Sequence, residues 1–199
     1  MSKECNGKFI VIEGIDKSGK STLCKNLIEM LAHGTKQTVL LKSFPNRDSI
    51  TGKVIDKYLN KKIQLNPQTI HLLFSANRWE EVQVYKDLKN KIIICDRYFL
   101  SGIAYTAAKG INLEWAKAPD MGLPVPDLIV FLDITAMETA KRSGYGDEKY
   151  DSICYQSKCY DLLKKMVFEH PNGVVIDANI KEDHLCKKVL NLILDLFDK

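Results

Sequence analysis

The sequence predicts an α/β fold in which a five-stranded parallel sheet is flanked by helices. Five short runs are continuously apolar rather than alternating with polar residues, as expected for strands that are buried on both faces. These runs span residues 8–12, 38–44, 91–95, 128–133 and 174–176. Stretches with helical periodicity separate them, and this alternation is typical of doubly wound proteins. The chain shows no repeat and no linker, so we expect residues 1–199 to form one domain.

The predicted helices carry apolar side chains on one face. They span residues 21–31, 67–89, 158–168 and 183–197. In the first of them, Leu23, Leu27 and Leu31 recur at the spacing of a helix that packs on a sheet. Residues 109–126 contain three prolines and a glycine after position 118, which makes this segment the least regular one. We expect it to be a surface excursion that leads into the fourth strand.

Length and charge narrow the class of protein. A chain of 199 residues with 45% hydrophobic residues can bury a sizeable core. Twenty-nine basic and 25 acidic residues give a net charge of +4, and the basic residues are scattered along the chain. A nucleic-acid-binding protein usually concentrates them on one face. We therefore expect small anionic molecules as partners and no nucleic acid.

The remaining composition favours a cytoplasmic location. The six cysteines never form a C-x-x-C pattern, which argues against zinc and for a reducing compartment. No apolar stretch is long enough to cross a membrane, so no membrane partner is expected. The first residues, MSKECNGK, resemble neither a signal peptide nor a transit peptide.

The segment GIDKSGKS, residues 14–21, has the spacing of a phosphate-binding loop. It follows the first strand and opens the first helix, which is the context that this motif requires. Its glycines let backbone N–H groups turn toward a phosphate at the helix N-terminus. Lys20 is expected to reach the β- and γ-phosphates and Ser21 to bind Mg²⁺. Asp16 is unusual in such a loop because a carboxylate repels phosphate, so we expect it to face another group.

Two predicted strands end in aspartate. Asp96 is followed directly by Arg97, which suits a site that balances metal and phosphate charge. Asp133 is expected to end its strand or to cap a helix. The chain contains no N-K-x-D motif to bind guanine and no D-x-x-G after a strand, which argues against a GTPase.

Several further residues could bind a nucleoside monophosphate. Arg47 follows the second strand, and its planar guanidinium suits a phosphate. Phe74 and Arg78 share a helical face, where a ring could stack on a base and a guanidinium could bind its edge. From the residues alone, a core position for Phe74 and a solvated surface position for either arginine remain open.

Two more segments are unusual. Ser101, Gly102 and Tyr105 lie in a stretch rich in small residues, where a ligand could approach the backbone. The segment AKRSGYGDEKY, residues 140–150, has glycines that permit hinge motion and bases, among them Arg142, that could close over phosphates. A solvated charged loop is the alternative for this second segment.

Taken together in their order along the chain, these motifs resemble those of thymidylate kinases of the eukaryotic and poxviral type. The resemblance rests on FPNR, LLFSANRWE, DRYFLSGIAYTAAKG, PDMGLPVPDLIVFLD and AKRSGYGDEKY behind the phosphate-binding loop. It implies a P-loop kinase fold with a short lid at about residues 140–150. The implied reaction transfers the γ-phosphoryl group of ATP to dTMP and gives dTDP and ADP, in dTTP synthesis, with Mg²⁺. The resemblance also implies a homodimer.

The resemblance implies three sets of site residues. The ATP-binding set comprises Gly14, Ile15, Asp16, Lys17, Ser18, Gly19, Lys20, Ser21, Thr22 and Arg142. The dTMP-binding set comprises Asp16, Phe44, Arg47, Phe74, Arg78, Arg97, Ser101, Gly102, Tyr105, Tyr150 and Gln156. The catalytic set comprises Lys17, Lys20, Asp96, Arg97 and Arg142. Ser21 and Asp96 would hold Mg²⁺, Asp96 through water.

The resemblance also implies roles within these sets. Asp16 would bind the 3′-hydroxyl of dTMP, which accounts for a carboxylate in the loop. Arg47 and Arg97 would hold the dTMP phosphate. Phe74 would stack on thymine and Arg78 would bind its carbonyl oxygen.

The resemblance also implies roles for residues around the bound nucleotides. Tyr105 would pack under the sugar, where a ribose 2′-hydroxyl would clash. Arg142 would lie against adenine, and Tyr150 and Gln156 near the thymidine. Lys17 stands where many family members carry arginine, and so supplies charge without a bidentate fork.

Two other interpretations compete with a monophosphate kinase. A deoxynucleoside kinase would phosphorylate a sugar hydroxyl and would have less use for an arginine dedicated to an acceptor phosphate. A regulatory module would bind ATP without turnover, but it would not need the intact set of Lys20, Ser21, Asp96 and Arg97.

Overall fold

Five parallel strands form one sheet in the order β2-β3-β1-β4-β5. The structure is a computed structural model that describes residues 7–86, 88–142, 149–150 and 152–198. The strands are β1 (Lys8–Glu13), β2 (Thr38–Ser43), β3 (Lys91–Asp96), β4 (Leu128–Asp133) and β5 (Gly173–Asp177). All five predicted strands are confirmed, and their ends differ from the prediction by only one residue.

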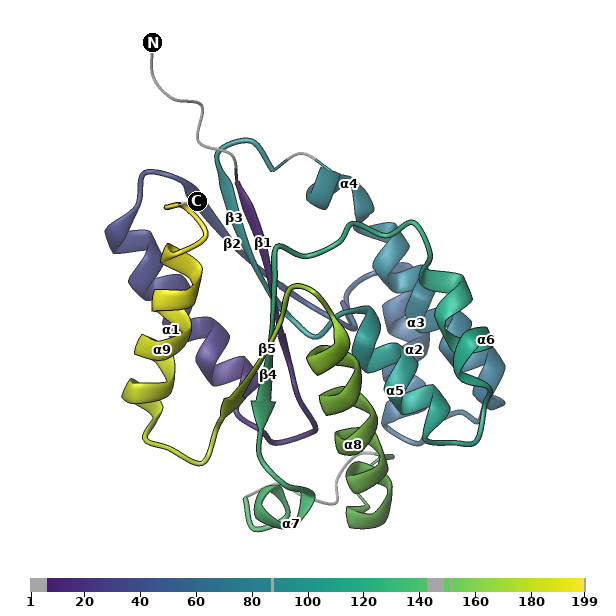
Figure 1. Ribbon diagram of the computed structural model, residues 1–199. Coiled ribbons are helices and arrows are strands. Elements are labelled where there is room, and N and C mark those ends of the chain that lie inside the picture. Colours follow the sequence, from purple (N-terminus) through teal and green to yellow (C-terminus); the bar gives the residue numbers. More distant parts are fainter. Residues whose placement is uncertain (1–6, 87, 143–148, 151, 199) are drawn as a thin grey trace.

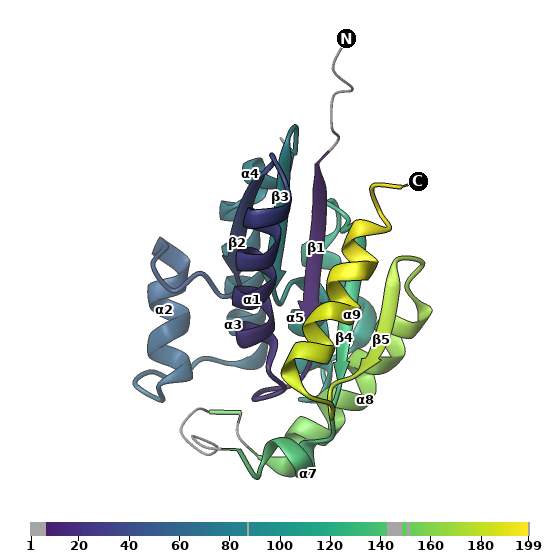
Figure 2. The same cartoon turned by 90° about the vertical axis from the view of Figure 1, so that its left-hand side faces the viewer.

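Helices cover both faces of the sheet (Figure 1). On one face lie α1 (Lys20–Gly34) and α9 (Glu182–Leu194), which cross in front of the strands in Figure 2. On the other face lie α5 (Phe99–Ala107) and α8 (Ile153–Glu169), with α3 (Pro67–Glu80) and α2 (Ile50–Leu59) beyond them. The short helices are α4 (Val82–Lys86), α6 (Leu113–Lys117), the 3₁₀ turn η1 (Ala118–Asp120) and α7 (Ala136–Thr139).

The central strand β1 is apolar at four successive positions, residues 9–12. Phe9 and Val11 pack into the cluster under α5 and α8, and Ile10 and Ile12 into the cluster under α1 and α9. Alternate side chains of a strand point to opposite faces, so a strand with a helical layer on each side needs apolar residues at every position.

The helical region predicted at residues 67–89 consists of two helices, since α3 ends at Glu80 and α4 covers Val82–Lys86. One prediction about an irregular segment is wrong. The segment 109–126, expected to be an irregular surface excursion, contains α6 and η1, and Asp120 in it is buried. Local periodicity could not show this, since the segment is short and packs on α5 and α3 rather than on the sheet.

Helix α2 was also absent from the prediction, although the chain carries a start signal for it. The Ser49 side chain accepts a hydrogen bond from the Gly52 amide at 3.1 Å, as a helix N-cap does. Ile55, Tyr58 and Leu59 then form a small core with Ile70 of α3. This pairing places α2 and α3 side by side beyond the carboxyl end of β2.

Asp133 ends its strand as predicted, but it caps no helix. It accepts hydrogen bonds from Tyr160 and Lys164 of α8, and Thr135 is the residue that caps α7.

Among the cysteines that the structure describes, all five are free thiols, and only Cys154 is exposed. The described helices include none with the length and apolar character of a membrane span.

Candidate active site

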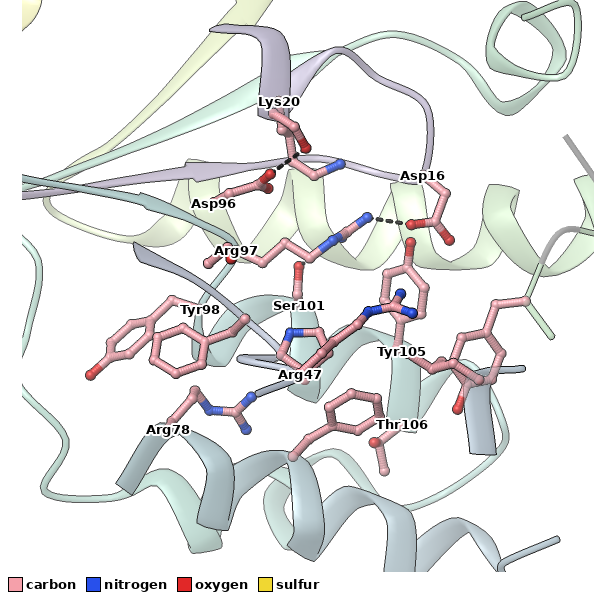
Figure 3. A pocket seen from close by; sticks show the side chains of 18 of the residues that line it. Asp16, Lys20, Arg47, Arg78, Asp96, Arg97, Tyr98, Ser101, Tyr105 and Thr106 are labelled. Carbon is pink, nitrogen blue, oxygen red and sulfur yellow. Dashed lines mark hydrogen bonds and ion pairs between the residues drawn. The ribbon is translucent and has the colours of Figure 1, made fainter. Parts of the chain in front are cut away.

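A pocket of about 510 Å³ opens where the carboxyl ends of β1, β2 and β3 meet (Figure 3). Strand register brings these ends together, because Asp96 of β3 is paired with both Ile12 of β1 and Ser43 of β2. Ligands of open parallel sheets bind at this edge. The predicted site residues that line the pocket are Asp16, Lys17, Lys20, Ser21, Phe44, Arg47, Phe74, Arg78, Asp96, Arg97, Ser101, Gly102, Tyr105 and Tyr150.

The loop at residues 14–21 has the backbone of an anion cradle. Gly19, the N-cap of α1, has φ of 101°, a conformation in which a side chain would be strained. Lys17 also has a positive φ, of 60°. Left-handed residues of this kind turn successive N–H groups to one side of the chain, where they can bind phosphate oxygens.

Lys20 lies inside the loop and spans it. Its Nζ donates to the Ile15 carbonyl at 2.7 Å and contacts Ser18 Oγ at 3.2 Å. Burial lowers the pKa of Lys20 to about 8, with a further lowering by Arg97 and an opposing effect of Asp96 and Asp16. An anion on the loop would replace these internal partners and stabilise the ammonium form.

Ser21 and Asp96 form the pair of oxygen ligands expected at a magnesium site. Ser21 Oγ donates to Asp96 Oδ2 at 2.5 Å across the loop–strand junction. Hydroxyl and carboxylate oxygens are hard ligands, and Mg²⁺ is usually held by one or two of them with water and phosphate completing its shell. The residues present therefore fit a phosphate-bound Mg²⁺.

The Asp16 carboxylate lies beside the Arg97 guanidinium in the pocket (Figure 3). It accepts hydrogen bonds from Arg97 Nη2 and, at 2.5 Å, from Gln156 Nε2. Gln156 Oε1 in turn accepts from the Asp16 amide and the Tyr105 hydroxyl, each at 3.1 Å. Burial would raise the pKa of Asp16, but Arg97, Lys20 and Gln156 outweigh it, so this pKa lies below its usual value.

Arg78 is held in position by a residue that the sequence analysis missed. Arg78 Nε and Nη2 donate to the two Asp120 carboxylate oxygens at 3.0 and 2.7 Å. Both side chains are almost completely buried, at 2% and 3% exposure, so the surface alternative for Arg78 is wrong. Phe74, one turn earlier on α3, is half-buried and faces the pocket. The only sequence signal for Asp120 was its place in the PDMGLP motif.

Position 102 carries glycine because the Arg78 guanidinium occupies the space that a side chain would need. A Cβ added at Gly102 would lie 2.7 Å from Arg78 Nη2 and 3.0 Å from its Nη1. The sequence analysis expected a ligand to approach the backbone here. In the structure the Arg78 guanidinium makes this close approach, and Arg78 lines the pocket.

Two arginines, Arg47 and Arg97, line the pocket from different segments of the chain. Arg97 follows β3 and lies with its guanidinium carbon 5.3 Å from the Tyr105 ring centre. Arg47 reaches the pocket from the loop after β2 and pairs with Asp56 of α2 at 2.7 Å. Together with Lys20 they place three cationic side chains in the lining of the pocket.

The far end of the pocket holds tyrosines. Lys109 Nζ donates to the Tyr150 hydroxyl at 2.8 Å, and Tyr150 donates to the Tyr58 hydroxyl at 3.2 Å. Burial lowers the pKa of Lys109 to about 8. Lys109 was not predicted, since nothing local distinguishes it from a surface lysine.

The remaining predicted residues lie beside the pocket rather than in its wall. Arg142 Nη1 donates to the Lys17 carbonyl at 2.7 Å, so the segment after α7 lies against the phosphate-binding loop. Gly14, Ile15, Ser18, Gly19 and Thr22 belong to the loop or the first turn of α1. The predicted lid at about 140–150 falls for the most part on residues 143–148, outside the described residues.

Comparison with known proteins gives one consistent family. The family model described as Thymidylate kinase matches residues 12–189. The thymidylate kinase of Schizosaccharomyces pombe is 44% identical and aligns with 97% of this chain and 94% of its own. The human thymidylate kinase is 41% identical, with 80% and 77% covered. The solved structure of thymidylate kinase from Candida albicans superimposes with a TM-score of 0.83 at 38% identity, over 96% of this chain and 92% of that one.

Proposed function

The chain belongs to the thymidylate kinase family, and on that premise we propose how its residues carry out the reaction. As a member it phosphorylates dTMP to dTDP, and the family implies ATP as the donor. We propose that dTMP occupies the pocket of Figure 3 and that the ATP phosphates lie on the loop at residues 14–21. The observation that carries this assignment is Asp16, a carboxylate within the phosphate-binding loop that lines the pocket and accepts hydrogen bonds from Arg97 and Gln156.

On the donor side, Lys20 and the loop amides would bind the β- and γ-phosphates. Ser21 and Asp96 would hold Mg²⁺, which, when bound, neutralises charge on the ATP phosphates. Lys17 and Arg142, which contact each other at 2.7 Å through the Lys17 carbonyl, would lie near the transferring group.

On the acceptor side, Arg47 and Arg97 would bind the dTMP phosphate and reduce its repulsion from ATP. The acceptor is already an anionic phosphate, so the site needs no strong general base. Phosphoryl transfer has a loose transition state in most analyses, and the protein mainly aligns the two nucleotides and neutralises charge. A site made of cations and positioned donors suits this chemistry.

Thymine would lie between Phe74 and the Arg78 wall. Because Asp120 takes Nε and Nη2 of Arg78, its Nη1 remains to donate to a base carbonyl. Tyr105 would pack under the deoxyribose. A donor fixed in this way favours a keto base over an amino base.

We further propose that the chain acts as one domain, as a homodimer, in the cytoplasm. Support for the dimer comes from the family and from exposed apolar side chains on α2 and α3, among them Ile50 and Leu72. Support for the cytoplasm comes from the five free cysteines in the described part of the chain.

Phe74→Ala is expected to weaken dTMP binding by about 1–3 kcal/mol, the usual contribution of a base stacked on an aromatic ring. ATP binding should be little changed, because Phe74 belongs to α3 and not to the phosphate-binding loop. Titration calorimetry with each nucleotide measures both effects. Gln68→Ala, an exposed polar position on the same helix, is the control. Equal losses for dTMP and ATP, or unfolding, would assign Phe74 to the core instead.

A further inference from the structure

Glu13, the last residue of β1, is a fully buried carboxylate that the reaction as described does not use. Its exposure is 0%, and in the part of the chain that the structure describes it forms no ion pair. A buried charge without a cation is costly unless hydrogen bonds satisfy it. Glu13 has three: from the Tyr98 amide at 3.0 Å, from the Ser101 amide at 3.1 Å, and from the Ser101 hydroxyl. These donors belong to the N-terminus of α5, whose dipole also favours an anion.

The first consequence concerns the backbone at Arg97. This residue has φ of 68°, a left-handed conformation that is unfavourable for residues other than glycine. Two neighbouring residues of β1 hold this turn. The Arg97 amide donates to the Ile12 carbonyl at 3.0 Å, and the Tyr98 amide donates to the Glu13 carboxylate. Glu13 therefore helps to keep Arg97 in this conformation.

The second consequence concerns the Arg97 side chain. A carboxylate only accepts hydrogen bonds, so the Ser101 hydroxyl must donate to Glu13 and has its lone pairs free to accept. One of them accepts from Arg97 Nη1 at 3.1 Å, and the other Nη1 hydrogen goes to the Gly14 carbonyl at 2.8 Å.

These contacts leave a defined part of the guanidinium to the ligand. Nη2 gives one hydrogen to Asp16, and Figure 3 shows Arg97 lying between Asp16 and Ser101. Among the described residues, Nε and the second Nη2 hydrogen have no hydrogen-bond partner and remain for a phosphate in the pocket.

We propose that Glu13 is a positioning residue for Arg97. It fixes the left-handed turn and the direction of the Ser101 hydroxyl, so that the free edge of the guanidinium faces the acceptor phosphate. This inference rests on the proposed role of Arg97 in binding the phosphate of dTMP. It predicts that the effect of Glu13 depends on the phosphate of the ligand, which a general role in folding would not produce.

Glu13→Gln in the full-length protein tests this dependence. The amide can still accept from the two backbone N–H groups, but its NH₂ would face the Ser101 oxygen and release the hydroxyl from its present direction. The affinity for dTMP should fall about tenfold, the size of effect expected when a charged hydrogen bond is lost. The affinity for thymidine, which has no phosphate, should stay within about twofold. Calorimetric titration with both ligands gives the two values.

Asp127→Asn is the matched control. The Asp127 carboxylate accepts from the Phe9 amide at 2.7 Å at the opposite end of β1. This change should lower thermal stability but leave the affinities for dTMP and thymidine unchanged. Arg97→Lys is the reference for the phosphate contact and should weaken dTMP binding and spare thymidine.

The outcomes distinguish a failure of the positioning role of Glu13 from a failure of the proposed role of Arg97. If Arg97→Lys weakens dTMP binding and Glu13→Gln weakens both ligands equally or neither, the positioning role is overturned and the role of Arg97 stands. If Arg97→Lys has no effect on dTMP, the proposed role of Arg97 fails and this inference fails with it. If Glu13→Gln does not fold, Ser101→Ala removes the same link and should weaken dTMP but not thymidine. Unchanged dTMP affinity in that variant would also overturn the proposal.

Discussion

Replacing Lys20 with alanine should lower kcat by about two to three orders of magnitude, the effect of removing one group that stabilises charge in a transition state. Lys20 is buried within the phosphate-binding loop and is placed to reach the β- and γ-phosphates once an anion displaces its contacts with Ile15 and Ser18. The protein should remain folded, because the lost contacts are with its own loop and cost about 1.5–3 kcal/mol, less than the roughly 5–15 kcal/mol by which a folded domain is usually stable.

A coupled assay of ADP release measures this effect, and circular dichroism reports on folding. Lys25→Ala is the control, since Lys25 lies on the same helix and is exposed. Turnover close to that of the unmodified protein in a folded Lys20→Ala variant would show that ATP does not bind at this loop.

Asp16→Asn should lower kcat/KM for dTMP by more than tenfold. A hydrogen bond from the 3′-hydroxyl to a charged carboxylate contributes about 1.5–3 kcal/mol. Misplacing the acceptor also spoils its alignment with ATP. Asp16 is in addition a partner of Arg97 and Gln156, so the change can act through those residues as well as through the sugar.

An acceptor without the 3′-hydroxyl separates these effects. The unmodified protein should use 3′-deoxy-TMP less efficiently than dTMP, whereas Asp16→Asn should distinguish the two acceptors far less. Asp195→Asn, an exposed position directly after the last helix, controls for the loss of one charge. If Asp16→Asn and the unmodified protein lose the same factor on 3′-deoxy-TMP, Asp16 does not contact the 3′-hydroxyl.

The sheet and the phosphate-binding loop could be predicted because their signals are local. Strands buried on both faces are apolar at successive positions, as residues 9–12 of β1 are. The loop combines glycines, Lys20 and Ser21 at fixed spacing between a strand and a helix. Parallel strands bring their carboxyl ends to one edge, so Asp96 and Arg97 could be assigned to the site before the structure was known.

The supporting residues could not be predicted, because their partners are distant in the sequence. Asp120 binds Arg78 across 42 residues, and Glu13 binds Ser101 across 88. The periodicity of apolar residues along the sequence does not predict contacts between residues so far apart. Taken alone, Arg78 has the pattern of a surface residue and Asp120 that of a loop residue, and only their contact makes burial of either charge possible.

The most direct test of the account is a screen of acceptors with ATP and Mg²⁺. The reaction is followed by ADP release with dTMP, AMP, CMP, UMP and thymidine, and without an acceptor. We expect the highest kcat/KM with dTMP, little turnover with AMP or CMP, whose bases present an amino group to Arg78, and little ADP release without an acceptor. Faster turnover of AMP, CMP or UMP than of dTMP, or of thymidine than of dTMP, would contradict the assignment of this pocket.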